Sequence, residues 1–161
     1  MTRPRFASYR VLLVVACCLL GAGCAHDTYQ ERANMIKNHA DAFYDSLKAN
    51  RVESAIRDNE QIETMASQMG DTVKKRARQQ GTTAVEREFA LMTTANEAAA
   101  TNWLALGQYF AIKRQFSQAR ATYQRVIDTY TNPTDKPYRE QALRALRDLD
   151  ILNPPTPTTN P

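Results

Sequence analysis

Apolar residues recur at helical spacing through most of the chain between residues 28 and 152. Spacings of three and four residues place such positions on one face of a helix. The clearest stretch is Thr101 to Tyr130, where two such stripes are separated by a break short enough to be a hairpin turn. No stretch alternates with the period of two that a half-buried strand requires. The pattern therefore predicts an all-α fold of about five helices and no sheet.

The first two predicted helices form a hairpin. A capping box at Thr28 and Glu31 predicts the start of the first helix, and Asn50 with Glu53 predicts the start of the second. Both stripes are apolar enough to be buried. Their members are Tyr29, Ala33, Ile36, Ala40, Phe43 and Leu47 in the first helix, and Val52, Ala55, Ile56, Ile62, Ala66 and Met69 in the second.

The third predicted helix is unusually long. Residues 79–82 read as a loop, and Thr83 with Glu86 forms another capping box. From Val85 to Phe110 the apolar stripe runs without proline or turn signal, which predicts one helix of about thirty residues. We expect its first half to pack against the first hairpin. Before it, Gly70 is either a kink in the second helix or a boundary.

Two further helices complete the predicted fold. Pro133 follows the fourth, and Asp135 caps the fifth, which has Pro137 in its first turn. Residues 153–161, NPPTPTTNP, predict a disordered tail. The apolar stripes are Ala119, Tyr123, Val126, Ile127 and Tyr130 in the fourth helix, and Ala142, Ala145, Leu146, Leu149 and Leu152 in the fifth.

Residues 100–133 resemble a tetratricopeptide repeat, whose first helix opens with W-x2-L-G-x2-Y. The residues that carry the resemblance are Trp103, Leu106, Gly107 and Phe110 in the first helix, and Ala119 and Tyr123 in the second. Phe110 replaces the usual tyrosine, Val126 stands where a small residue is commoner, and Pro133 comes late. Residues 39–65 read as a degenerate second repeat, and the helix at 135–152 as a cap. The resemblance implies a helical protein-binding module.

In that family, residues of the first helix line an inner groove. By this register they are Thr101, Leu104, Gln108, Ala111 and Ile112. One variety of this repeat captures acidic C-termini with a lysine and an asparagine in the groove. This chain has Leu104 and Gln108 there instead. The resemblance therefore implies an amphipathic helix or an extended peptide of another protein as the occupant. The alternative is that the groove is filled by the chain's own N-terminal helices.

The first 23 residues have the form of a secretory signal peptide, with three arginines before a run of 13 apolar residues. That run is shorter than the ~20 residues a spanning helix needs, which argues against a retained membrane anchor. Gly21-Ala22-Gly23-Cys24 resembles the lipobox of bacterial lipoproteins and implies acylation of Cys24. Val14-Val15-Ala16-Cys17 also fits the lipobox pattern but would divide the apolar run.

The same resemblance implies that residues 24–27 form a lipidated tether. Ala25, rather than aspartate, after the cysteine points to the outer membrane, with the domain facing the periplasm. Signal removal takes away three arginines, which reduces 21 basic residues to 18 against 17 acidic ones, a net charge of +1. We therefore expect no nucleic-acid partner.

No residue pattern predicts catalysis. His26 and His39 are isolated, and no cysteine, histidine or carboxylate cluster has metal-ligand spacing. The basic run at Lys74, Lys75, Arg76 and Arg78 either complements a helix dipole or binds anionic lipid or an acidic partner. We expect no enzymatic activity and no cofactor. The predicted function is that of a scaffold or adaptor which assists an outer-membrane complex, with a permanent structural subunit as the alternative.

Overall fold

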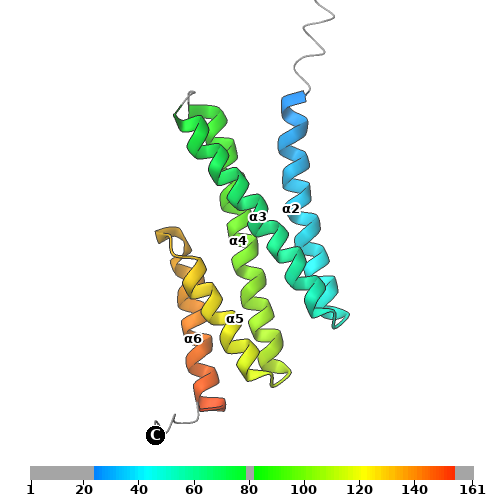
Figure 1. The fold of residues 1–161 in the computed structure, drawn as a ribbon, viewed down its shortest axis with the longest axis vertical. Coiled ribbons are helices and arrows are strands. Elements are labelled where there is room, and N and C mark those ends of the chain that lie inside the picture. The colour runs from blue at the N-terminus through cyan, green and yellow to red at the C-terminus, as the bar shows by residue number, and fades with distance from the viewer. Residues whose placement is uncertain (1–23, 79–81, 155–161) are drawn as a thin grey trace, which may run out of the picture. The chain divides into compact units, whose positions relative to one another are not determined.

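The computed structural model describes residues 24–78 and 82–154, with side chains for 28–78 and 85–154. This part of the chain contains five α-helices, one short 3-10 helix and no strand (Figure 1), which confirms the predicted all-α fold. The predicted signal peptide, loop residues 79–81 and tail residues 155–161 lie outside the described residues. The elements are α2 (Cys24–Lys48), α3 (Val52–Ala77), α4 (Thr82–Ile112), α5 (Phe116–Thr129), η1 (Pro133–Asp135) and α6 (Lys136–Leu152).

The chain divides into two compact units, Met1–Met35 and Ile36–Pro161. In the first unit the described residues, 24–35, are the opening turns of α2. The prediction that this helix starts at the Thr28 capping box was wrong, since α2 begins at Cys24. Neither proline nor glycine lies between the two positions, so nothing in the sequence stops the helix there.

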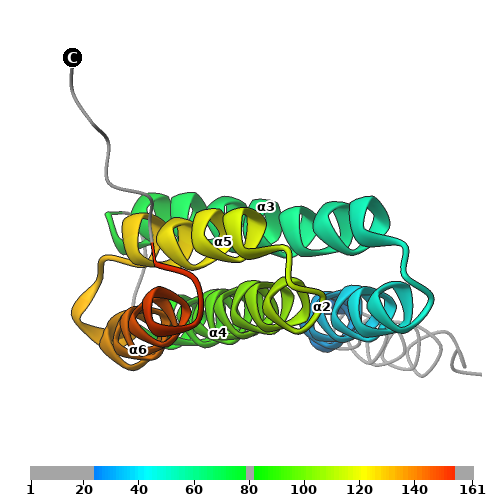
Figure 2. The same ribbon diagram turned by 90° about the horizontal axis from the view of Figure 1, so that it is seen from below.

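In the second unit, α3 packs against α4, α4 against α5, and α5 against α6. Figure 2 shows these helices in two layers, with α3 and α5 in one and α4 and α6 in the other. The core between them includes the fully buried side chains of Ile62, Leu106 and Val126. Each burial of this kind removes apolar surface from water and contributes roughly 1.5 to 3 kcal/mol.

The long helix predicted from the uninterrupted stripe is α4, with 31 residues. It begins at Thr82, which the sequence assigned to the preceding loop. Leu91 and Ala95 in its first half are buried, and this half packs on α3 as expected. α3 itself runs through Gly70 without a boundary. A Cβ atom there would lie 3.3 Å from Met92 Sδ, so glycine lets the two helices approach closely.

Two turns of the same geometry close the α2–α3 and α4–α5 hairpins. Each contains a residue with positive φ, Asn50 at 57° and Arg114 at 58°. In each, the amide after that residue donates to the carbonyl five residues back, from Arg51 to Ser46 at 2.8 Å and from Gln115 to Phe110 at 2.9 Å. Bonds from Asn50 to Leu47 and from Arg114 to Ala111 complete two Schellman motifs.

Asn50 therefore ends α2. The prediction that Asn50 caps the next helix, α3, was wrong. The N-cap of α3 is Arg51, which makes no side-chain capping bond. Asparagine suits both roles, because its short polar side chain can cap a helix and also tolerates the left-handed region. The sequence pattern alone did not separate these roles.

The corner between α5 and α6 is held by Asp135 and Arg139. Asp135 is the N-cap residue of α6 but makes no side-chain capping bond there. Its carboxylate accepts from the backbone and side-chain amides of Asn132 at 3.2 and 3.1 Å. Arg139 donates to the carbonyls of Tyr130 and Asn132 at 2.6 and 2.9 Å. These bonds fix the direction in which α6 returns along α5.

The predicted buried face of α6 is correct except at its end. Ala142 and Leu149 are buried, and Ala145 and Leu146 are half-buried. Leu152 is 70% exposed, so its assignment to the core was wrong. It occupies the last turn of α6, where no described helix covers it.

Candidate functional site

The candidate binding site is a cleft of about 570 Å³ lined by α4, α5 and α6. Four of the five residues predicted for the groove line it from α4, namely Thr101, Leu104, Gln108 and Ala111. The opposite wall comes from α6 and contains Gln141, Arg144, Ala145, Asp148, Leu149 and Leu152. The cleft therefore lies between two helices of the same layer.

The base of the cleft is apolar and its rim is polar. Leu104, Tyr123 and Leu149 at the base are each less than a tenth exposed. Burial, together with the nearby Asp148 carboxylate, raises the pKa of the Tyr123 hydroxyl. The exposed rim carries one cation, Arg144, and one anion, Asp148. Such a surface can bury apolar side chains and fix a peptide by a few polar contacts.

The structure does not bring Ile112 to this cleft. It lies in the last turn of α4, is 74% exposed and is not part of the lining. The predicted groove residues from Thr101 to Ala111 thus line the cleft, whereas Ile112, the next residue, does not.

The six residues predicted for the repeat core are all buried. Trp103, Leu106 and Phe110 from α4 and Ala119 and Tyr123 from α5 are each no more than 5% exposed. Gly107 is also buried and faces the Tyr123 ring, where a Cβ atom would lie 2.5 Å from Cε1. Cβ atoms essentially never come that close to another atom, so a larger residue at position 107 would force the Tyr123 ring or its helix to shift.

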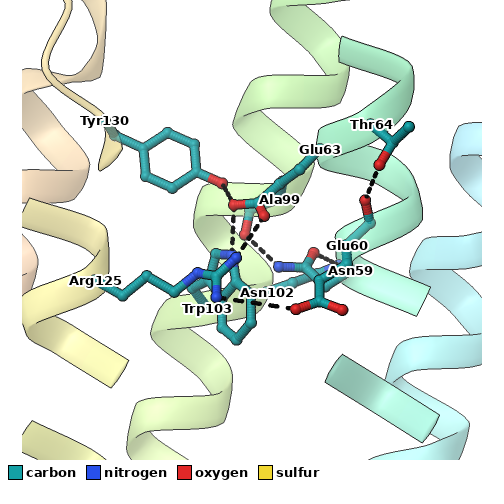
Figure 3. A network of polar contacts seen from close by, with 9 residues as sticks. All are labelled: Asn59, Glu60, Glu63, Thr64, Ala99, Asn102, Trp103, Arg125 and Tyr130. Atoms are coloured by element: carbon teal, nitrogen blue, oxygen red, sulfur yellow. Dashed lines mark hydrogen bonds and ion pairs between the residues drawn. The ribbon is translucent and has the colours of Figure 1, made fainter. Parts of the chain in front are cut away.

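Glu63 of α3 joins three helices through one carboxylate (Figure 3). Its Oε1 accepts from the indole N–H of Trp103 at 2.7 Å and from the hydroxyl of Tyr130 at 2.9 Å. Its Oε2 accepts from Arg125 Nη2 at 2.8 Å. Burial and the Glu63 carboxylate raise the pKa of Tyr130. The four residues come from α3, α4 and the α5 region, so the network fixes the position of α5 on the other two helices.

Arg125 also stacks on the Trp103 ring, with Cζ 4.0 Å from the ring centroid. A guanidinium over an indole face is a favourable cation–π pair. The Arg125 Nε atom is buried and has no hydrogen-bond partner among the described residues. The guanidinium is thus held by its face on the indole ring and by its Nη atoms at the carboxylates of Glu60 and Glu63.

A second buried polar pair explains the asparagine that interrupts the stripe of α3. Asn59 is fully buried and donates from Nδ2 to the carbonyl of Ala99 at 3.1 Å. It accepts from Asn102 Nδ2 at 2.9 Å. Asn59 thus pairs α3 with α4 by side-chain hydrogen bonds where a repeat would carry an aromatic residue.

Sequence reasoning missed both networks. Glu63 lies on a different helix from its donors, and the i, i+5 spacing of Arg125 and Tyr130 carries no helical signal. Asn59 and Asn102 were the one available hint, since each interrupts an apolar stripe. His39 is half-buried, and its Nδ1 lies 3.1 Å from Asp58 Oδ1.

The described residues contain no group of three His, Cys, Asp or Glu side chains placed to hold a metal ion. None of the described helices has the length and apolarity needed to cross a membrane. Cys24, the predicted acylation site, is the first residue of α2.

We compared the chain with protein-family models, with curated proteins and with solved structures, and none of the three comparisons gave a match.

Proposed function

We propose that the protein is a lipid-anchored scaffold or adaptor of the outer membrane that faces the periplasm. It binds another protein in the α4–α6 cleft and assists the assembly or localisation of an outer-membrane complex. The observation that carries this proposal is the cleft itself, with its apolar base of Leu104, Tyr123 and Leu149 and its exposed polar rim. An amphipathic helix or an extended peptide suits such a surface.

The repeat identity is part of the same proposal and is supported by the two matching turns. Asn50 and Arg114 are 64 positions apart, and some pairs of core residues with the same offset are alike in burial. Ala55 and Ala119 are both fully buried, as are Ile62 and Val126. The offset exceeds the 34 residues of a standard repeat by about 30. The excess lies in α3 and α4, which have 26 and 31 residues against 14 in α5.

The binding role can be tested by filling the cleft. Gln108→Trp places a large ring on the exposed wall of α4, and Gln118→Trp places the same ring on an exposed position of α5 outside the cleft. We expect the first variant to lose its partner when the tagged full-length protein is purified from membranes, and the second to retain it. Retention by both variants contradicts binding in this cleft.

The lipid anchor has its own test. Cys24→Ser should abolish both signal cleavage and incorporation of labelled palmitate, because the thiol is the proposed acylation site. Continued acylation of that variant would move the site to Cys17 or Cys18.

A permanent structural subunit is the second candidate, and α6 provides the observation that favours it. Leu143, Ile151 and Leu152 are 42%, 79% and 70% exposed on this last helix. Apolar residues at the end of a solenoid are normally covered. If the purified protein is a monomer that melts cooperatively, the adaptor is favoured. Aggregation without a partner favours the permanent subunit.

A further inference from the structure

A second cleft, of about 530 Å³, lies where α3 and α4 extend beyond the end of α5. α5 ends at Thr129, and this residue and Tyr130 form one end of the cleft. Its apolar lining includes Ala66 and Gly70 of α3 and Phe89 and Met92 of α4. Phe89 is 52% exposed, so a large aromatic side chain faces solvent here. This cleft shares no lining residue with the α4–α6 cleft.

α5 shows what kind of helix the α3–α4 surface accepts. It packs an apolar stripe on α4, and Gly107 of α4 lies against its Tyr123. It also presents one cation to α3, since Arg125 pairs with Glu63 at 2.8 Å and lies 3.9 Å from Glu60. The occupant of this surface within the chain is therefore an amphipathic helix with a basic side chain directed at α3.

The part of the α3–α4 surface that α5 leaves uncovered also combines acidic and apolar side chains. Three carboxylates line the second cleft, those of Glu63, Asp71 and Asp135, together with the ammonium group of Lys74. Glu63 is already paired with Arg125, so Asp71 and Asp135 are the acids left for an occupant. Asp71 is exposed and only loosely paired with Lys74 at 3.7 Å. Asp135 is 7% exposed and has no cationic partner among the described side chains. Acidic side chains around an apolar base favour a basic amphipathic occupant.

The length of the cleft sets the size of the occupant. Its lining on α3 extends from Glu63 to Lys74. At 1.5 Å per residue this corresponds to about 16 Å, or about three helical turns. We propose that the second cleft docks a helix of about this length from a partner protein, with apolar side chains against Phe89 and Met92 and lysine or arginine near Asp71. This docking is independent of the α4–α6 cleft.

The test uses two synthetic amphipathic helical peptides with the same leucine face, one with lysine and one with glutamate on the polar face. Binding of each fluorescein-labelled peptide to the full-length protein is measured by fluorescence anisotropy. We expect saturable binding of the lysine peptide, weakened by salt, and at least tenfold weaker binding of the glutamate peptide.

Four variants locate the binding. Phe89→Ala should weaken the lysine peptide at least fivefold, while Ile112→Ala, a similarly exposed apolar position outside both clefts, should not change it. Asp71→Lys should weaken the lysine peptide and strengthen the glutamate peptide. Gln108→Trp should leave both unchanged, since Gln108 lines the other cleft. Phe89 and Asp71 are exposed, so circular dichroism should show intact helices in both variants.

The proposal is overturned if neither peptide binds saturably, or if both bind equally. It is also overturned if Phe89→Ala and Asp71→Lys leave the affinity unchanged, or if Gln108→Trp abolishes binding. The last result would place the peptide in the α4–α6 cleft and would support the proposed function while removing this second site.

Discussion

The indole N–H of Trp103 donates a 2.7 Å hydrogen bond to Glu63, so the tryptophan that opens the predicted repeat motif is bound to the carboxylate that joins three helices. Glu63 is half-buried and accepts from three donors, one of them charged. Its loss would leave partly buried donors without an acceptor.

We therefore predict that Glu63→Ala lowers the free energy of unfolding by about 2 to 3 kcal/mol, because hydrogen bonds to charged groups contribute about that much. Glu60→Ala is the matched control, since this acid lies 3.9 Å from the same arginine and is exposed. It should cost less than about 0.5 kcal/mol. Urea denaturation measures both, and equal losses would contradict a special role for Glu63.

Gly107→Ala tests the close contact between α4 and α5. The added Cβ would lie 2.5 Å from Cε1 of Tyr123, a ring that is 5% exposed and cannot move freely. We expect a loss of about 1 to 3 kcal/mol, the usual cost of overpacking. Combining it with Tyr123→Leu should cost less than the sum of the two single changes. A fully additive double variant would show that the two residues do not meet.

Arg114→Gly should stabilise the protein. Arg114 has a φ of 58°, a region that costs a non-glycine residue about 1 to 2 kcal/mol. Glycine removes that cost but loses more backbone entropy on folding, which leaves a gain of roughly 0.5 to 1 kcal/mol. Lys113→Gly, one residue earlier and without a positive φ, should not stabilise the protein. Thermal melting of the two variants separates these outcomes.

Stability should fall at alkaline pH, with Tyr130 as one cause. Burial and Glu63 raise its pKa above the usual value of 10. A raised folded pKa means that the contribution to folding is fully present below pH 10 and is lost as the pH rises further. Tyr130→Phe should thus show a shallower decline between about pH 9 and about pH 11, measured by urea denaturation. An unchanged slope would contradict this assignment.

Most of the helical fold could be predicted from the spacing of apolar residues. The length of α4 followed from the absence of any break between Val85 and Phe110, and the six positions predicted for the repeat core are all buried. Helix ends were less predictable, because Asn50 and Thr28 carry capping signals that the fold does not use as predicted.

The candidate site was predictable only in part. The register of α4 gave four cleft residues, but the opposite wall depends on how α6 folds back at Asp135 and Arg139. The Glu63 network was not predictable, because its members come from three helices and depend on their packing. Local spacing describes one helix at a time, whereas both the cleft and the network are properties of several.

Partner binding in the α4–α6 cleft is best tested by site-specific photo-crosslinking in intact cells. A photoreactive residue is placed at Gln108 and at Arg144, on opposite walls of the α4–α6 cleft, and at Arg147, which is exposed on α6 outside it. We expect both cleft positions to crosslink to the same protein, and Arg147 not to crosslink to it. The same product from all three positions, or no product from the two cleft positions, would contradict partner binding in the cleft.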